Sequence, residues 1–307
     1  MSYAVLFTGQ ASQHPDMLPW LEAEPACTAA LGLMQQQLGS DWRQQLKVPA
    51  LKSNNAFAQV LITGTALAAW TAVRQRLSTG PVAVAGYSVG ELAAMGCAGA
   101  LTHAQAIELA GLRAQLMDRA VAHQATGLLG VTGMAESAVL AECAPLSLEC
   151  AIRISPVHGI FAGTDKALHQ ANAQLQALGA GCTRLEVRVA SHSSWMIPAA
   201  NAYAKALSTI IFEAPQCPVA LNASGQLARQ PMQLRLALSQ QLACTVQWSA
   251  CMDAIAERQI SCVLEVGGGS ALSRMWCERH PDVPVRALDE FRSVDGATAW
   301  VTKQACA

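Results

Sequence analysis

A serine in a glycine-flanked turn has the surroundings that a covalent nucleophile needs. The segment GYSVG at residues 86–90 has G-x-S-x-G spacing, with an apolar run before it and helix-forming residues after it. A strand–turn–helix of this kind strains the serine backbone and presents the Ser88 hydroxyl at the positive end of a helix dipole. The backbone N–H of Val89 would then donate to an oxyanion. An incidental serine in a glycine turn is the alternative.

His192 is the histidine that the sequence places best to act as the base for such a serine. It directly follows an apolar, strand-like segment, and parallel α/β sheets carry functional groups at their strand ends. His14, after the first glycine turn, is a second candidate by position, but no motif supports it. A turn histidine held by neighbouring serines explains His192 equally well. No aspartate is adjacent, so a backbone carbonyl is a candidate to orient the ring.

Arg113 is the most informative charge in the chain. Its neighbours three and four residues away are Leu109, Ala110, Leu116 and Met117, and residues at these spacings share one helix face. A buried cation costs several kcal/mol unless it is compensated. The side chain therefore either snorkels or pairs with an internal carboxylate, or it binds a substrate carboxylate through two hydrogen bonds. Together with an acyl-forming serine, the last reading predicts an acyl group that bears its own carboxylate.

Composition narrows the functional class. The chain has 307 residues, of which 52% are apolar and 13% charged, and a net charge of −1. This excludes a disordered chain and offers no overall basic field for nucleic acid. Eleven cysteines without a CxxC pair or a Cys/His cluster predict free thiols in a reducing cytoplasm, with no metal site. In so uncharged a chain, an arginine on an apolar face stands out.

Two local patterns point more weakly to phosphate. Residues 43–90 contain five basic side chains and no acidic one, which favours a solvated surface but also suits the phosphates of a CoA-type ligand or an acidic carrier protein. Gly267-Gly268-Gly269 follows a strand-like run but lacks the spacing of a known phosphate loop. The basic residues of the first pattern are Arg43, Lys47, Lys52, Arg74 and Arg76.

The chain shows no membrane or export signal, and we expect a cytoplasmic protein without a membrane partner. Residues 53–73 carry no charge but include polar residues throughout, so their continuous apolar part is shorter than the ~20 residues of a span. A buried core helix is the better prediction. The N-terminal residues lack the basic and apolar regions of a signal peptide.

The elements that must position these residues alternate between strand and helix. Strand-like runs at 3–7 and 82–86 are each followed by helical patterns, and Thr102 with Gln105 forms a capping box for a helix that reaches about residue 123. Such alternation indicates an α/β fold with a parallel sheet. Residues 127–189 instead show a βαββαβ order, with its last strand at 185–189, which is the ferredoxin-like pattern of an inserted subdomain.

Six segments, in order along the chain, resemble the motifs of malonyl-CoA:acyl-carrier-protein transacylases. The segments are GQASQ at 9–13, GYSVGE at 86–91, LRAQLM at 112–117, SHSSWM at 191–196, VQW at 246–248 and EVG at 265–267. They span nearly the whole chain, and several motifs in family order are far more specific than any one of them. The resemblance implies an α/β-hydrolase-like core formed by 1–125 and 190–307, with a ferredoxin-like insert at 126–189.

The resemblance also implies the site and the partners. Ser88 would be the acylated nucleophile and His192 the base, then the acid. The backbone N–H groups of Gln10 and Val89 would form the oxyanion hole, and Arg113 would bind the malonyl carboxylate. The carbonyl of Gln247 would orient His192. The substrates would be malonyl-CoA and the thiol of an acyl carrier protein, with no tightly bound cofactor.

Some residues depart from the usual family pattern. Ala11 replaces a glycine in the first turn, and Tyr87 replaces the histidine before the serine. The GYSVGE elbow and the segment LDEFRS at 288–293 resemble the acyltransferase (epsilon) subunit of malonate decarboxylase, which implies that enzyme's carrier subunit as the acceptor. The alternatives are a malonyl transacylase of fatty-acid synthesis, a serine esterase or thioesterase, and a non-catalytic scaffold subunit. A hydrolase would normally have an HGGG-type oxyanion loop, which is absent.

Overall fold

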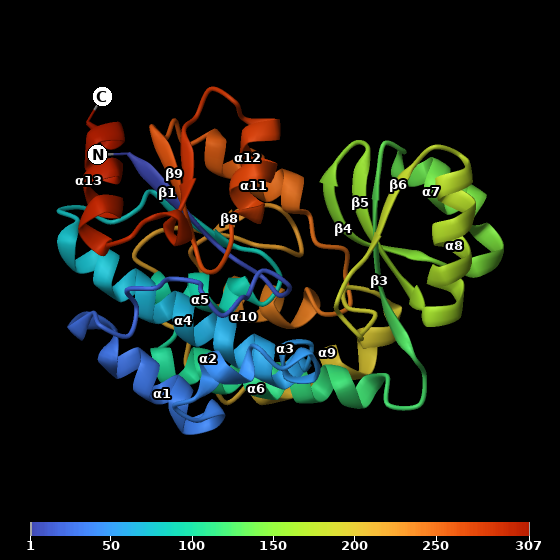
Figure 1. The fold of residues 1–307 in the computed structure, drawn as a ribbon, viewed down its shortest axis with the longest axis horizontal. Helices are drawn as coiled ribbons and strands as arrows, with labels where there is room; N and C mark the ends of the chain where they lie inside the picture. Colours follow the sequence, from blue (N-terminus) through green and yellow to red (C-terminus); the bar gives the residue numbers. More distant parts are fainter. Residues whose placement is uncertain (1, 307) are drawn as a thin grey trace.

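Two β-sheets organise the chain in the computed structural model, which describes residues 2–306 (Figure 1). The larger sheet has six strands in the order β10-β9-β1-β2-β7-β8, and only the β7–β8 pair is antiparallel. The mixed α/β class and the parallel sheet agree with the sequence prediction. The strands of this sheet are β1 (Tyr3–Phe7), β2 (Ala83–Gly86), β7 (Val219–Ala220), β8 (Leu227–Ala228), β9 (Cys262–Val266) and β10 (Val285–Ala287).

The central strands of this sheet bring three functional loops to one edge. Strands β1, β2 and β9 are buried at every residue, as expected for a parallel sheet that is covered on both faces. Phe7 at the end of β1 lies opposite Gly86 of β2 and Val266 of β9. The loops after these strands therefore start side by side, at the carboxyl edge where parallel sheets bind ligands.

Helices cover both faces of this sheet, and α4 (Asn55–Arg76) is a core helix, as predicted (Figure 1). By length and composition α4 would pass as a membrane span, but 89% of its most apolar window is buried inside the protein. The others in this part of the chain are α1 (Thr28–Leu38), α2 (Trp42–Gln45), α3 (Pro49–Lys52), α5 (Gly90–Cys97), α6 (His103–Ala120), α9 (Ile197–Leu207), α10 (Pro231–Gln240), α11 (Trp248–Ala256), α12 (Ala271–Arg279) and α13 (Val294–Ala305), with 3-10 turns η1 (Pro25–Cys27), η3 (Ser194–Met196) and η4 (Leu288–Glu290).

Helix α6 begins where the capping box predicts. The Thr102 hydroxyl accepts from the Gln105 N–H, and the Gln105 side chain accepts from the Thr102 N–H. Two of the N–H groups that a helix start leaves unpaired are thereby satisfied. The helix then runs for 18 residues against α4 and α9, which places Arg113 in the interior between them.

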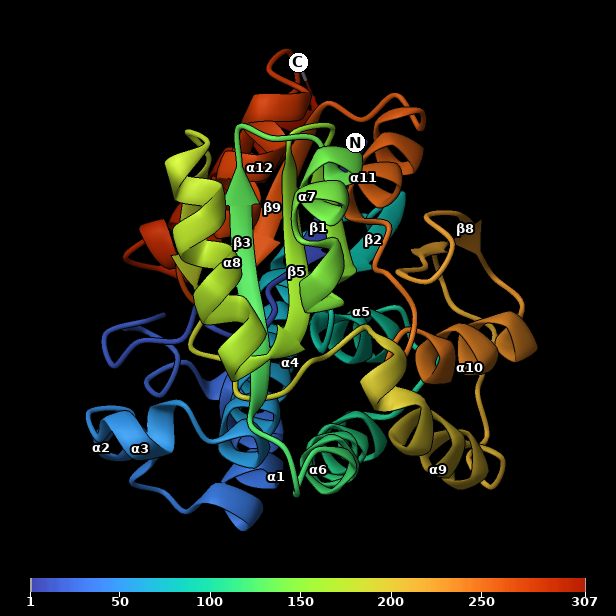
Figure 2. The ribbon, with the colours of Figure 1, turned by 90° about the vertical axis from the view of Figure 1, so that its right-hand side faces the viewer.

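The second sheet has four strands in the order β4-β5-β3-β6, all antiparallel (Figure 2). Its helices pack on one face and enclose a separate small core. The division into a core and an inserted unit at 126–189 stays a prediction, with which this arrangement agrees. The elements are β3 (Thr126–Thr132), α7 (Glu136–Glu142), η2 (Ala144–Leu146), β4 (Glu149–Ser155), β5 (His158–Thr164), α8 (Asp165–Ala177) and β6 (Gly181–Arg184).

The strand expected at 185–189 lies earlier in the chain, at β6. The alternation that suggested it is real, since Val187 and Val189 are buried while Glu186 and Arg188 are exposed. Residues 185–189 form no strand, although the Leu185 N–H still donates to the Leu128 carbonyl of β3 at 3.1 Å. Val187 lines a cavity and Val189 packs in the main core. Burial outside a sheet therefore produced the same alternation as a strand.

Candidate active site

The turn after β2 holds Ser88 in a conformation that only its glycine neighbours permit. Ser88 has φ of 54°, in the left-handed region, which is strained for a residue with a side chain. A Cβ on Gly86 would lie 2.0 Å from the backbone of Gly90, and one on Gly90 would lie 2.4 Å from the Phe7 carbonyl. Gly86 is thus required for β2 to approach the start of α5, and Gly90 for α5 to approach the end of β1.

Asn222, at the end of β7, braces this turn from the neighbouring strand. Its side chain accepts from the Ser88 N–H at 2.8 Å and donates to the Gly86 carbonyl at 2.7 Å. The Asn222 N–H donates to the buried carboxylate of Glu91 at 2.8 Å. The Asn222 side chain therefore satisfies two backbone groups on the N-terminal side of the strained serine.

Ser88 and His192 form a hydrogen-bonded pair. The distance from Ser88 Oγ to His192 Nε2 is 2.8 Å. The other ring nitrogen, Nδ1, lies 2.5 Å from the Gln241 carbonyl. A carbonyl only accepts, so Nδ1 carries the proton and Nε2 is free to accept from the serine hydroxyl. This is the geometry of a nucleophile with its general base.

The carbonyl that orients His192 belongs to Gln241, and the assignment to Gln247 is wrong. Gln241 lies just beyond the end of α10, where its carbonyl is released from the helix and meets the ring. Gln247 precedes α11; its N–H donates to the Asn222 carbonyl, and its side chain contacts Arg153 and Thr245. Its carbonyl accepts from Cys251 in the first turn of α11.

The imidazole of His192 is held neutral. Its side chain is buried, and burial together with the nearby Arg113 lowers the pKa of His192 to about 3 from 6.5, although the Gln241 carbonyl opposes the shift. A neutral imidazole at neutral pH is the form that can accept a proton from Ser88.

The lowered pKa of His192 predicts a specific loss of stability in acid. Between pH 6.5 and 3 His192 is protonated in the unfolded chain but neutral in the folded chain. The free energy of unfolding therefore decreases as the pH falls through this range. We expect His192→Gln to lose less free energy of unfolding than the wild type between pH 7.5 and 5, by about 1–2 kcal/mol. Urea unfolding at the two pH values measures this difference. The exposed His123→Gln is the control; equal pH dependence in H192Q and wild type would contradict the assignment.

Arg113 is buried beside the nucleophile without a carboxylate partner. Its side chain is 1% exposed, and within residues 2–306 no acidic group forms an ion pair with it. Its Nη1 donates to Gln59 at 2.7 Å, while Nη2 donates to Gln241 at 3.1 Å and to Ser88 Oγ at 3.3 Å. The Nε–H has no partner among the described residues. The guanidinium therefore still has an N–H group without an acceptor, and it lies next to the serine oxygen.

Gln241 also links Arg113 to a buried acid. Its side-chain oxygen accepts from Arg113, and its amide donates to Glu91 at 2.8 Å and to the Ser88 carbonyl at 3.1 Å. Burial raises the pKa of Glu91 to about 7, despite hydrogen bonds from Asn222 and Gln241 that favour the carboxylate. Gln241 is thereby bonded through both atoms of its side-chain amide, and such buried polar networks rigidify the groups that they join.

The two predicted oxyanion donors lie on either side of Ser88. Gln10 follows β1 and lines the same cavity as Ser88, Arg113 and His192. Val89 is the N-cap residue of α5. Among the described residues 2–306, neither N–H has a protein acceptor. Unpaired N–H groups beside a nucleophile can serve an oxyanion, and their roles stay predictions.

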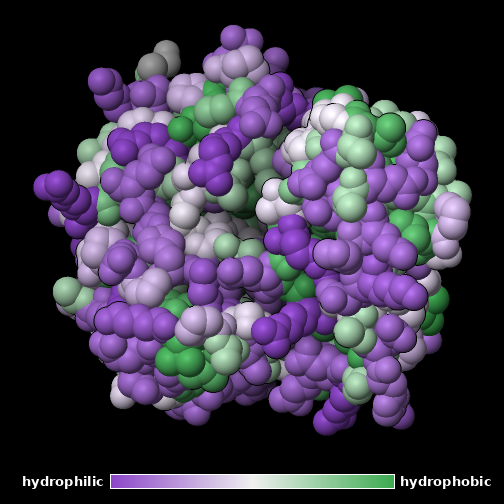
Figure 3. Space-filling view, turned by 45° about the vertical axis from the view of Figure 1, so that its right-hand side comes forward, coloured by the Kyte–Doolittle hydropathy of each residue, from purple (hydrophilic) through white to green (hydrophobic). Residues whose placement is uncertain are grey.

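The catalytic cavity is small, about 40 Å³, and shares lining residues with two larger pockets. One, of about 420 Å³, lies between the loop after β1 and the start of α12, and it shares Gln10 and Tyr87 with the cavity. Tyr87 lines both this pocket and the catalytic cavity, and its ring packs edge-on against Trp248 with centroids 5.1 Å apart. Figure 3 shows this face of the molecule hollowed between the two sheets, with hydrophilic side chains along the rim.

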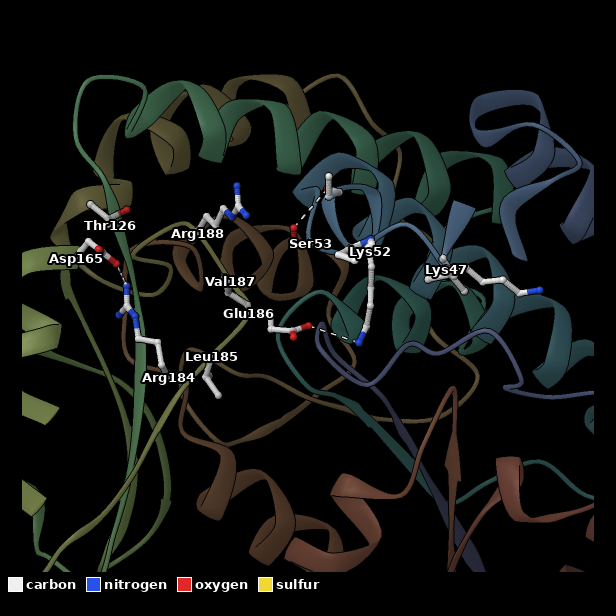
Figure 4. Close-up of a pocket in the computed structure, with 13 residues that line it drawn as sticks. Lys47, Lys52, Ser53, Thr126, Asp165, Arg184, Leu185, Glu186, Val187 and Arg188 are labelled. Carbon is white, nitrogen blue, oxygen red and sulfur yellow. Dashed lines mark hydrogen bonds and ion pairs between the residues drawn. The ribbon is translucent and has the colours of Figure 1, made fainter. Parts of the chain in front are cut away.

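The second of these larger pockets, with a volume of about 550 Å³, is a basic cleft between α3 and residues 184–188 (Figure 4). It adjoins the catalytic cavity, because Leu185 and Val187 line both. Lys52 pairs with Glu186 at 3.5 Å and Arg184 with Asp165. The remaining cations of this cleft, Lys47 and Arg188, form no ion pair within the described chain.

Part of the basic run at 43–90 serves the structure. Arg43 pairs with Glu22 and binds three carbonyls of the loop after β1. Arg76 pairs with Glu24 and Asp295. Lys47 and Lys52 line the basic cleft. The prediction of a solvated surface therefore holds for part of the run. The alternative, a site for phosphate, remains only for the residues that line the basic cleft.

Sequence reasoning did not single out four polar residues of this site. Glu91 is the last residue of the elbow motif, so its position was a usable signal. Asn222 is the last residue of a predicted strand, and this position is a weaker signal. Gln59 and Gln241 lie in helical segments without any motif, and only packing brings them to Arg113. His14 is not brought to the cavity around Ser88, since it pairs with Asp289.

The chain is similar to known proteins in both sequence and fold. A family model described as an acyl transferase domain matches residues 6–279. The malonyl CoA-acyl carrier protein transacylase of Salmonella typhimurium is 30% identical over 96% of this chain and 98% of its own, and that of Escherichia coli K12 is 29% identical over 94% and 96%.

Solved structures agree with this comparison. A malonyl-transacylase in complex with its type II PKS acyl-carrier protein superimposes with a TM-score of 0.90 at 27% identity, covering 97% of this chain and 99% of that one. An acyl-carrier-protein S-malonyltransferase from Burkholderia pseudomallei gives 0.89 at 28% identity, covering 97% and 100%.

Proposed function

The chain belongs to the acyl transferase domain family, and we propose that it transfers malonyl from malonyl-CoA to the thiol of an acyl carrier protein. One observation carries the choice of acyl group: the guanidinium of Arg113 is buried, forms no ion pair with a carboxylate of residues 2–306, and lies 3.3 Å from Ser88 Oγ. An acyl group on Ser88 that bears a carboxylate would supply that partner. Bidentate arginine–carboxylate pairing gives both energy and orientation.

The residues act in two half-reactions. Ser88 Oγ attacks the thioester carbonyl while His192 Nε2 takes the hydroxyl proton, and the oxyanion accepts from the Gln10 and Val89 N–H groups. The C–S bond then breaks, and His192 returns the proton to the departing CoA thiolate. The carrier thiol attacks the malonyl-serine ester by the reverse path, with its proton passing through His192 to Ser88.

The malonyl carboxylate itself would improve the base. Burial and the charge of Arg113 both lower the pKa of His192. A carboxylate bound to Arg113 neutralises one of these two causes, so the pKa of His192 rises toward the working pH, where a general base is most effective. An acetyl group brings no such charge. The same arginine would therefore select malonyl in binding and in proton transfer.

Both substrates carry phosphate on a long arm, and the basic cleft suits that end. Lys47 and Arg188 form no ion pair within the described residues. The cleft adjoins the catalytic cavity, since Leu185 and Val187 line both, and Figure 4 shows these four residues around the cleft. Unpaired cations at the mouth of a site raise the local concentration of anionic ligands.

The acceptor we propose is the carrier subunit of malonate decarboxylase. The GYSVGE elbow and the LDEFRS segment support this branch. The relatives from Salmonella typhimurium and Escherichia coli K12, both named malonyl CoA-acyl carrier protein transacylases, equally support a carrier of fatty-acid synthesis as the acceptor.

Acceptor choice is the experiment that tests the proposal. With malonyl-CoA as donor, we expect at least tenfold higher kcat/KM with the malonate decarboxylase carrier than with a fatty-acid carrier, which corresponds to ~1.4 kcal/mol of discrimination. Radiolabelled malonyl on each holo-carrier measures both rates in parallel. A preference for the fatty-acid carrier would contradict the assignment to malonate decarboxylase but would still agree with malonyl transfer as the reaction. Hydrolysis without transfer to either carrier would favour a thioesterase instead.

A further inference from the structure

Three loops that follow neighbouring strands meet at one carboxylate, that of Asp289. Strands β1, β9 and β10 are adjacent and parallel, so the loops after them leave from one edge of the sheet. Asp289 lies in η4, directly after β10, and its side chain is 8% exposed. Its Oδ1 accepts from the Leu18 N–H at 2.5 Å, and its Oδ2 lies 2.7 Å from both the Gly269 N and His14 Nε2.

The loop after β1 is the strained partner in this arrangement. It carries Gln10, and two of its non-glycine residues have left-handed backbones, with φ of 82° at Ala11 and 47° at Leu18. Each such residue costs roughly 1–2 kcal/mol and persists only where its surroundings hold it. The Ala11 N–H is held by the Gln13 side chain at 2.9 Å, and the Leu18 N–H by Asp289.

The glycine segment 267–269 packs closely against the same loop. A Cβ on Gly267 would lie 1.8 Å from the hydroxyl of Thr8, and one on Gly268 would lie 3.1 Å from the Ser12 carbonyl. The segment thus packs on residues either side of Gln10. Because Asp289 also binds the Gly269 N–H, it ties this packing surface to the far end of the strained loop.

We propose that Asp289 is a positioning residue that holds the Gln10 N–H in place for the oxyanion, which rests on the proposed function for Gln10. Asp289 touches no reacting atom and acts through the loop after β1. Losing an oxyanion donor outright lowers rates by ~10²–10³. A donor that is displaced but still present should cost less, about tenfold. This gives the LDEFRS segment a role in catalysis, far along the chain from the serine.

Asp289→Asn tests the proposal, because an amide keeps the shape but cannot accept on both sides. p-Nitrophenyl acetate is the probe: its acetyl group moves to Ser88 Oγ and p-nitrophenolate leaves. The burst amplitude counts folded, active sites, so the acylation rate per site does not respond to mere loss of folded protein. We expect D289N to lower that rate about tenfold with little change in KM. Glu290→Gln, an exposed neighbour paired with Arg286 at 3.2 Å, should match the wild type.

The outcomes separate this proposal from the proposed function. A wild-type burst with p-nitrophenyl acetate but no malonyl transfer would remove the function and leave the Asp289 test intact. An unchanged rate per site in folded D289N would overturn the positioning role. If D289N does not fold, Asp289→Glu keeps the charge but shifts it by one methylene; it should slow acylation severalfold, and an unchanged rate there would overturn the proposal equally.

Discussion

Ser88→Ala is expected to abolish the covalent malonyl-enzyme and to lower transfer to a carrier by a factor on the order of 10⁴ or more. The hydroxyl is the only atom removed, and it is the one that His192 and Arg113 both contact, at 2.8 and 3.3 Å. The backbone strain at φ of 54° is the same for alanine. Activity should therefore fall without a matching loss of stability. Intact-protein mass spectrometry after exposure to malonyl-CoA measures the adduct.

The matched control for Ser88→Ala is Ser239→Ala. Ser239 is also largely buried, but its hydroxyl bonds to the Leu236 carbonyl of its own helix, α10. S239A should form the full adduct. A malonyl adduct that persists in S88A would assign the nucleophile elsewhere and would remove the two-step mechanism with it.

Arg113→Ala should reverse the choice between malonyl and acetyl groups. Truncating one partner of a buried charge pair costs about 2–5 kcal/mol, so kcat/KM for malonyl-CoA should fall by ~10²–10³ or more. Acetyl-CoA carries no free carboxylate and should lose far less. Removing the positive charge also removes one cause of the lowered His192 pKa, which favours proton transfer to His192. Parallel acylation rates with the two thioesters measure the selectivity.

Arg119→Ala provides the comparison for Arg113→Ala. Arg119 lies in the last turn of the same helix but is exposed, so its loss should change both rates little. Equal losses for malonyl and acetyl in R113A would mean that Arg113 only supports the fold, through Gln59 and Gln241. In that case the proposed acyl specificity would fail while Ser88 chemistry remained.

The features that were predictable from sequence are those set by neighbouring residues. The turn at 86–90 requires its glycines because the start of α5 packs directly against the backbone of β2 and of β1. The G-x-S-x-G spacing that signals this turn can be read from five consecutive residues. The capping box at Thr102 is local for the same reason. The apolar face around Arg113 follows from helical periodicity, so its burial could be foreseen without knowing what covers it.

The partners of those residues were decided by tertiary structure. Gln241 and Gln247 are both amides near the end of the chain, but only the path of the chain after α10 brings the carbonyl of Gln241 to His192. Gln59 reaches Arg113 from a helix 54 residues away. Hydrogen bonds between distant segments depend on how whole elements pack, and no short spacing encodes them.

The sequence by itself thus determined the nucleophile's turn, the buried arginine and the parallel sheet that holds them, because each follows from short-range sterics or periodicity. The tertiary structure decided which carbonyl orients the base, which amides hold the arginine, and that Asp289 ties the loop of Gln10 to the segment after β9. The Asp289 contacts join the ends of strands that neighbour each other in the sheet but lie far apart in the chain. Only the strand order puts them together.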